Sequence, residues 1–342
     1  MKKLFLVLVL FLFSCNNDYI EFHNKKVEET QKNTNIEKAL NDFSFDDIKY
    51  LSWITLKETP DTKFLDELVE KINNSQEKVY VEVYIFTEKR LRTAIKKAYD
   101  RWVQVKVLLE KNVYKASYLN NDTFKYFKNA WIDVRYSNAE NYYLNHTKMM
   151  IIDDEVVLST WNYSYSSFKY NREFFLSIKN SEILDVLEKI FLADFEWVKE
   201  NFYHSNLVLS PFYSREKFEY LLKNAKNSIK IYSLNFWDDS IEKILTQKAK
   251  SWTNIEMIFP SLSKVESNSW VIEKFSSSWI KIKEIKKPEI HAKAILIDDK
   301  YLYIWSVNFS YYSIDKNREI WLLLSNQEII KKFLEIFTKD FE

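Results

Sequence analysis

The order of apolar and polar residues along the chain repeats itself after about 150 residues. Each half begins with an amphipathic helix pattern, a strand-like apolar run, a second helix pattern and a second apolar run. These ranges are 61–72, 79–86, 88–101 and 103–109 in the first half, and 215–225, 228–236, 239–250 and 255–259 in the second. The pattern predicts an internal duplication of one α/β layout.

Both halves also end in the same way. A strand carrying His-x-Lys leads to another strand (156–159 and 301–304), a polar loop, a strand that starts at a glutamate, and a closing helix (181–200 and 326–341). Strands alternating with helices predict an α/β fold of two similar lobes, each a mixed β-sheet flanked by helices, related by pseudo-two-fold symmetry. The halves meet near 201–214, so we expect lobes at 46–204 and 205–342.

The N-terminus has the pattern of an export signal. Two lysines precede ten apolar residues, Leu4 to Phe13, whereas a bilayer core requires about 20. Leu12-Phe13-Ser14-Cys15 resembles a bacterial lipoprotein signal, which makes Cys15 the expected lipidation site. We therefore expect a signal peptide at 1–15, a polar tether at 16–45, and a protein anchored on the outer face of the bacterial cell membrane. An ordinary secretory signal or an uncleaved anchor is the alternative.

Composition changes this picture in one respect. Hydrophobic residues make up 46% and charged residues 29% of the 342 residues, and the formal net charge is +1, so charge alone gives no argument for a nucleic-acid partner. The chain has no glycine and eleven tryptophans. Trp102, Trp131 and Trp279 fall between a helix pattern and a strand pattern, where helices often end on a left-handed glycine.

We hypothesise that many or all of these tryptophans are glycines in the organism, because a UGA codon that the organism decodes as glycine has been read as tryptophan. The alternative is an aromatic-rich protein whose turns are made by Asn and Asp. That alternative explains the absence of glycine but leaves the positions of the tryptophans unexplained.

Two of the four histidines stand in the same frame, in NHTKMMIID at 145–153 and IHAKAILID at 290–298. Lysine follows two residues later, aspartate seven later, and an Asn, a second Asn and a Glu further on. The shared positions are His146, Lys148, Asp153, Asn162, Asn171 and Glu173 in the first copy, and His291, Lys293, Asp298, Asn308, Asn317 and Glu319 in the second. A single histidine on an apolar strand is explained equally well by packing, but the doubled frame favours chemistry.

These residue types suit a phosphodiester. Residues two apart on a strand share a face, so each His and Lys point into one space. One imidazole can attack phosphorus while the other protonates the leaving oxygen, and Lys and Asn hold the non-bridging oxygens. Glu173 and Glu319 are candidates to orient the rings. No metal is expected, because the chain outside the signal has no cysteine and a lysine beside each histidine repels cations.

The segments H-T-K-M-M-I-I-D, S-T-W-N and N-R-E, and their second copies H-A-K-A-I-L-I-D, W-S-V-N and N-R-E, resemble the two HKD signatures of the phospholipase D superfamily. That resemblance implies two α/β lobes around one cleft, no metal or cofactor, and a phosphohistidine intermediate. It makes His146 the nucleophile and His291 the acid, although the sequence alone leaves these roles interchangeable. It gives Asp153 and Asp298 a structural role. The sequence departs from the signature at Trp305, where the second motif has glycine, and at Ser159 and Trp161.

The resemblance implies a phosphodiesterase that works as a monomer, because both motifs are in one chain. We expect it to hydrolyse phospholipids or to transfer their phosphatidyl group. A membrane-anchored nuclease that cleaves DNA or RNA is the main alternative. A binding module without catalysis is the third, and the intact His, Lys, Asn and Glu of both copies argue against it.

Overall fold

The computed structural model describes residues 34–306 and 308–342. They form two units, 34–43 and 44–342. The first contains a short helix at 34–41, within the segment expected to be a tether. The predicted signal peptide, Cys15 and His23 lie outside the described residues. Both predicted lobes belong to the second unit, which begins with a 3-10 turn at Phe45–Asp47.

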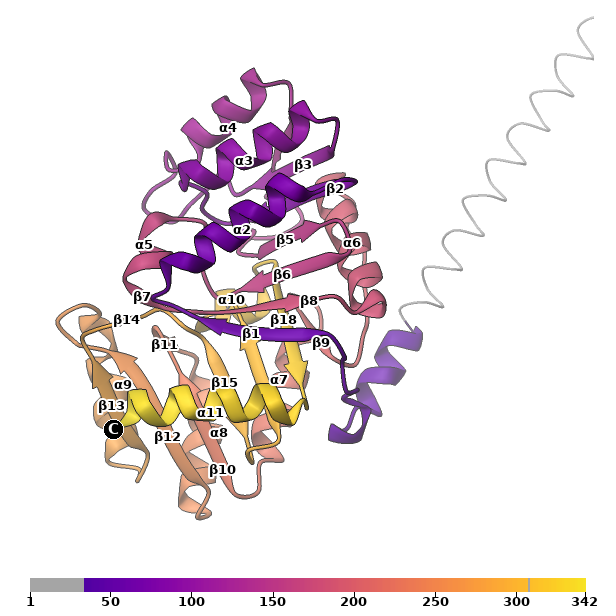
Figure 1. Cartoon of the computed structure of the whole chain (residues 1–342). Coiled ribbons are helices and arrows are strands. Elements are labelled where there is room, and N and C mark those ends of the chain that lie inside the picture. Colours follow the sequence, from indigo (N-terminus) through magenta and orange to yellow (C-terminus); the bar gives the residue numbers. More distant parts are fainter. Residues whose placement is uncertain (1–33, 307) are drawn as a thin grey trace, which may run out of the picture. The chain divides into compact units, whose positions relative to one another are not determined.

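The first lobe is a seven-stranded sheet with the order β1-β8-β6-β5-β2-β3-β4 (Figure 1). Its strands are β1 (Ile54–Glu58), β2 (Lys78–Val83), β3 (Gln104–Leu109), β4 (Asp133–Tyr136), β5 (Lys148–Ile152), β6 (Glu155–Ser159) and β8 (Phe174–Ile178). Its helices are α2 (Thr62–Asn74), α3 (Lys89–Asp100), α4 (Asn121–Asn129), α5 (Tyr165–Lys169) and α6 (Ser181–Phe195).

The second lobe repeats this order as β9-β18-β16-β15-β10-β12-β13. Its strands are β9 (Leu207–Ser210), β10 (Ser228–Tyr232), β12 (Asn254–Pro260), β13 (Lys281–Ile285), β15 (Ala294–Ile297), β16 (Tyr301–Trp305) and β18 (Glu319–Leu324). Its helices are α7 (Ser214–Lys223), α8 (Asp239–Lys250), α9 (Ser269–Ser276), α10 (Tyr311–Asp315) and α11 (Gln327–Phe341). Two-residue strands complete the body: β7 (Asn171–Arg172), β11 (Phe236–Trp237), β14 (Glu289–Ile290) and β17 (Phe309–Ser310).

Strand directions confirm the predicted mixed sheets. In the first lobe β2, β3 and β4 are parallel, and β5 joins them antiparallel to β2. In the second lobe β10, β12 and β13 are parallel, and β15 is antiparallel to β10. The parallel pairs need crossover helices, which the sequence supplies as amphipathic helices. The two lobes are joined directly where β7 pairs with β14, at the left of Figure 1.

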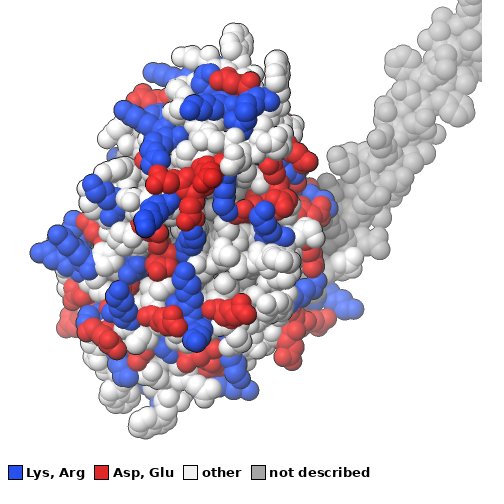
Figure 2. Space-filling view, in the orientation of Figure 1, with Lys and Arg blue, Asp and Glu red and all other residues white. Residues whose placement is uncertain are grey.

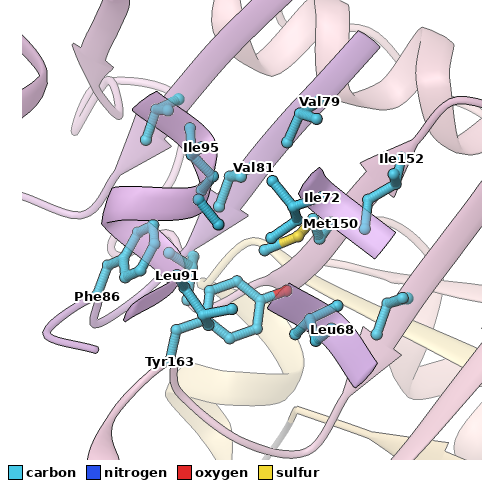
Figure 3. Packing of buried hydrophobic residues seen from close by; sticks show 14 of the residues in the cluster. Leu68, Ile72, Val79, Val81, Phe86, Leu91, Ile95, Met150, Ile152 and Tyr163 are labelled. Atoms are coloured by element: carbon cyan, nitrogen blue, oxygen red, sulfur yellow. The ribbon is translucent and has the colours of Figure 1, made fainter. Parts of the chain in front are cut away.

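Helices cover both faces of the first sheet. Phe64, Leu68 and Ile72 of α2 are buried on the face that also receives Val81 of β2 and Met150 of β5, and Figure 3 shows this packing. The spacing of the α2 residues puts them on one side of the helix. On the opposite face Tyr80 stacks on Phe191 of α6, with ring centroids 4.9 Å apart. The central strand β5 is consequently buried along its whole length.

The structure corrects several predicted boundaries. The strands expected at 79–86 and 228–236 end at Val83 and Tyr232, and the helix expected at 181–200 ends at Phe195. The segment expected to separate the lobes contains β9, and β1 was not predicted at all. Both strands are short and lie at the edges of their sheets, where their pairing with β18 and β8 defines them.

Tryptophan occupies the left-handed backbone region at six sites. The φ angles are 61° at Trp53, 71° at Trp102, 61° at Trp131, 60° at Trp197, 67° at Trp252 and 62° at Trp279. Trp102 and Trp252, which follow α3 and α8, are 95% and 94% exposed. This confirms that Trp102, Trp131 and Trp279 stand where a left-handed helix end is required. Trp161 and Trp321, in contrast, are buried and pack against other aromatic rings.

We expect Trp102→Gly to raise the free energy of unfolding by about 1 kcal/mol, because glycine has no Cβ to clash in the left-handed conformation. Trp102→Ala is the matched control, since alanine removes the indole but keeps the Cβ. Urea titrations of the two variants measure the difference. Equal stability of the glycine and alanine variants would contradict the prediction.

Peptide mass spectrometry of the protein isolated from its own organism tests the decoding hypothesis directly. Glycine masses are expected at positions 102, 131 and 279. Tryptophan masses there would refute it.

Candidate active site

The two motif histidines sit at equivalent places in the two lobes. His146 immediately precedes β5 and His291 lies just before β15, the strands that pair antiparallel with β2 and β10. The backbone of each histidine is held by the other lobe. The amide of His146 donates to the carbonyl of Arg318 at 2.9 Å, and the amide of His291 donates to that of Arg172 at 3.2 Å. Both histidines therefore lie at the interface between the two lobes.

Each imidazole ring is hydrogen-bonded to the glutamate of the opposite motif. His146 Nδ1 lies 2.9 Å from Glu319 Oε2, and His291 Nδ1 lies 2.8 Å from Glu173 Oε1. An Nδ1–H donated to a carboxylate fixes the tautomer and leaves Nε2 as the nitrogen available for chemistry. The glutamates suggested by the sequence are thus both beside a histidine, but each pair is completed across the lobes.

Hydroxyl and amide groups hold both glutamates in the same way. Thr160 Oγ1 donates to Glu173 at 2.7 Å, and Ser306 Oγ donates to Glu319 at 2.5 Å. The side-chain amide of Asn171 donates to Glu173 at 3.1 Å, and that of Asn317 donates to Glu319 at 3.4 Å. Since both carboxylates are completely buried, these bonds offset the cost of removing them from water.

Burial and crowding of cations shift the pKa values at the site. Burial is the largest of the effects that together lower the pKa of His146 to about 4; Lys148 and Lys293 also lower this pKa, and Glu319 opposes them. Burial likewise lowers the pKa of His291, and Lys293 and Lys148 add to that effect. Burial lowers the pKa of Lys293 to about 8. Because the lysine of each lobe acts on the histidine of the other, the four groups form one cluster that a bound anion would stabilise.

The side-chain amide oxygens of the two motif asparagines are buried. Asn162 follows β6, and Asn308 follows β16. Within the described residues their Oδ1 atoms are buried and have no hydrogen-bond partner. Buried amide groups are normally satisfied, so each Oδ1 can still accept a hydrogen bond, for example from a hydroxyl, while phosphate oxygens would be bound by the Nδ2 groups.

The motif aspartates lie at the other end of the strands. Asp153 accepts hydrogen bonds from the backbone amides of residues 76, 77 and 78 at 2.8–3.0 Å, and Asp298 binds those of residues 226, 227 and 228. Both adopt positive φ angles, 50° and 54°. Their contacts fix the loops that enter β2 and β10, in keeping with the structural role implied by the resemblance.

Sequence reasoning missed four residues of this arrangement. Thr160 and Ser306 precede the motif asparagines by two residues, and Arg172 and Arg318 are the middle residues of N-R-E. Arg172 binds Asp340 through two bonds of 2.6 and 2.8 Å, and Arg318 binds Asp194 at 2.6 Å. Each arginine therefore clamps a helix of the opposite lobe. These residues stand at equivalent positions in the two copies of the motif, and that repetition is the sequence signal that could have indicated them.

The tyrosines before the first motif have different environments. Tyr142 is buried and donates to Asp194 at 3.2 Å, whereas Tyr143 is exposed. A third tyrosine, Tyr84, lies edge-on to the ring of His146 at 4.5 Å. Among the described residues, no group of three His, Cys, Asp or Glu side chains is placed to hold a metal. In the same part of the chain, no helix has the length and apolar character needed to span a bilayer.

We expect His146 to titrate near pH 4, and Lys148→Met to raise that pKa, because a neighbouring cation is removed from the buried ring. NMR of the four histidines measures this. His204 is the internal control, since the charged groups that act on it are Glu182, Lys49 and Lys217. A His146 pKa near 6.5 in the unaltered protein would contradict the described cluster.

Known proteins share both the sequence pattern and this fold. The family model described as cardiolipin synthase, PLD-like domain, matches residues 68–195 and 219–341. Cardiolipin synthase from Clostridium perfringens strain SM101 is 23% identical over 323 residues, covering 80% of this chain and 67% of the relative. Cardiolipin synthase 1 from Staphylococcus epidermidis strain RP62A is 23% identical over 333 residues, covering 82% of this chain and 66% of the relative.

The structure of phosphatidylserine synthase from Haemophilus influenzae superposes with a TM-score of 0.71 at 15% identity, covering 90% of each chain. At that identity the likeness shows the fold. The family match covers both lobes and both His-x-Lys motifs. This chain belongs to the PLD-like domain family of cardiolipin synthases, within the phospholipase D superfamily.

Proposed function

We propose that the protein transfers the phosphatidyl group of a phospholipid to an alcohol, with hydrolysis as the competing outcome when water is the acceptor. The observation that carries this proposal is the pair of crossed His–Glu contacts, which engage Nδ1 of both rings and leave Nε2 for chemistry in a cluster where Lys148 and Lys293 act on both histidines. The named relatives, which are cardiolipin synthases, favour transfer over hydrolysis.

In the first step, neutral His146 attacks phosphorus through Nε2. A P–N bond forms while the bond to the leaving alcohol oxygen breaks, and His291 donates its Nε2 proton to that oxygen. Burial lowers the pKa of both histidines, so His146 is ready to attack, while the negative phosphodiester favours the protonated form of His291. Lys148, Lys293 and the two motif asparagines bind the non-bridging oxygens.

In the second step the acceptor takes the place of the first alcohol. Neutral His291 removes the proton of the acceptor hydroxyl, whose oxygen attacks phosphorus as the P–N bond breaks and His146 is released. An alcohol gives a new phospholipid, and water gives phosphatidic acid. Protons balance, because His291 gives one in the first step and recovers one in the second.

The assignment of roles can be tested with a phosphodiester whose leaving group is p-nitrophenolate, which needs no protonation. We expect His291→Ala to release about one equivalent of p-nitrophenol and then stop as a phosphoenzyme. His146→Ala should release none. Stopped-flow absorbance and intact-protein mass measure the two events, and the opposite behaviour of the two variants would exchange the roles.

The substrate can be tested with vesicles of labelled phosphatidylglycerol and with single-stranded DNA, both in EDTA. Cardiolipin and free glycerol are the products expected from transfer, and phosphatidic acid is the product of hydrolysis. DNA cleavage without lipid turnover would support the nuclease alternative and refute the lipid proposal.

Glu319→Gln should lower kcat on the order of 10²–10⁴-fold, because the amide cannot orient His146 or stabilise its charge as the carboxylate does. Steady-state rates on the same vesicles measure the loss. Glu182→Gln is a matched control, because Glu182 contacts His204 rather than a motif histidine.

A further inference from the structure

Several exposed tyrosines lie on the loops and short helices next to the motif positions. Tyr165 of α5 comes three residues after Asn162, and Tyr311 of α10 comes three residues after Asn308. We call the following set the tyrosine rim; its members are 50–55% exposed, and they are Tyr143, Tyr165, Tyr170, Tyr311 and Tyr312. The two copies of the motif therefore each present an exposed aromatic ring at the same place.

The rim is continuous with the active site. The residue before each short helix is hydrogen-bonded to the motif asparagine. The backbone amides of Ser164 and Ser310 donate to the carbonyls of Asn162 and Asn308 at 2.8 Å. Tyr143 lies three residues before His146 and packs on Tyr312 of the other lobe, with ring centroids 4.7 Å apart. The rim thus includes residues of both lobes and lies beside the shared cluster.

Lysines accompany the rim tyrosines on both sides. Lys169 Nζ lies 5.1 Å from the ring centre of Tyr165 and 5.3 Å from that of Tyr170, and Lys316 Nζ lies 5.5 Å from that of Tyr311. Asp315, the last residue of α10, forms an ion pair with Arg215. Lys169 at the end of α5 and Lys316 just after α10 therefore add positive charge to the rim, while the exposed Asp239 lines the same hollow as Tyr311.

We propose that the tyrosine rim, with Lys169 and Lys316, docks the active site onto an anionic phospholipid surface. Tyrosine suits the boundary of a bilayer because its ring is apolar and its hydroxyl is polar, and lysines beside it attract anionic headgroups. The face over β1 and α11 is different, because there Lys and Arg are interspersed with Asp and Glu (Figure 2). The inference rests on the proposed lipid substrate and adds the surface that presents it.

Single-stranded nucleic acid also binds surfaces of aromatic and basic residues, through bases stacked on open ring faces. The rim rings instead pack against one another, with the centroids of Tyr165 and Tyr170 6.1 Å apart and those of Tyr311 and Tyr312 5.7 Å apart, and Lys169 donates to the hydroxyl of Tyr165 at 2.7 Å. This arrangement favours the lipid surface, and the experiment includes DNA as a competing outcome.

A fluorescent probe placed at the rim tests the docking. In the full chain carrying Cys15→Ser and His146→Ala, Ser166→Cys on α5 is labelled with the environment-sensitive dye NBD. Ser251→Cys, an exposed site after α8, is the matched control. Vesicles of phosphatidylglycerol and phosphatidylcholine should shift the emission at 166 to the blue and leave that at 251 unchanged. Vesicles of phosphatidylcholine alone should produce a much weaker response at 166.

Lys169→Gln with Lys316→Gln should weaken the response at 166 on the order of tenfold in vesicle concentration. No response at 166, an equal response at 251, or no effect of the lysine substitutions would overturn the proposal. A response at 166 to single-stranded DNA but not to vesicles would also overturn it. Because these proteins are inactive by design, turnover of detergent-dispersed lipid by the unaltered protein reports separately on the proposed function.

Discussion

The buried contact between each motif imidazole and a carboxylate of the opposite lobe is the interaction on which the joining of the two lobes depends. Glu173 and Glu319 are fully removed from solvent, and an ionised carboxylate in that position is costly unless it is bonded. Each one has a threonine or serine hydroxyl and an asparagine amide from its own lobe, but its histidine comes from the other. Each lobe therefore supplies only part of the hydrogen bonding of its glutamate, and the surface that joins the lobes is also the candidate active site.

Much of this arrangement can be predicted from local sequence. The apolar periodicity of segments such as 61–72 and 239–250 predicts helices, and the confirmed mixed sheets follow from their alternation with strands. The doubled spacing also indicates His146, His291 and their lysines. The edge strands β1 and β9 could not be predicted, because their pairing partners lie more than 100 residues away. Sequence likewise could not show that the glutamates are exchanged, since the choice of partner is made only when the lobes pack.

The left-handed tryptophans are a separate energetic problem. Each costs about 1 kcal/mol of backbone strain, so six of them cost roughly as much as the lower end of the net stability of a folded domain, about 5 kcal/mol. Asp153 and Asp298 lie in the same backbone region, but the carboxylate of each accepts hydrogen bonds from three backbone amides, and these bonds offset the strain. The exposed indoles of Trp102 and Trp252 have no comparable compensation from burial. Glycine at the six sites removes the strain, and at position 197 it also removes the hydrogen bond from the indole to the carbonyl of Tyr136.

The pairing of β7 with β14 has a consequence for how molecules reach the catalytic centre. A clamshell movement that separated the lobes would part these strands, break both arginine clamps and strip the two rings of their carboxylates in one event. In such an open form neither histidine would have the carboxylate that orients its ring. Substrate and product therefore have to reach and leave the two rings without separation of the lobes.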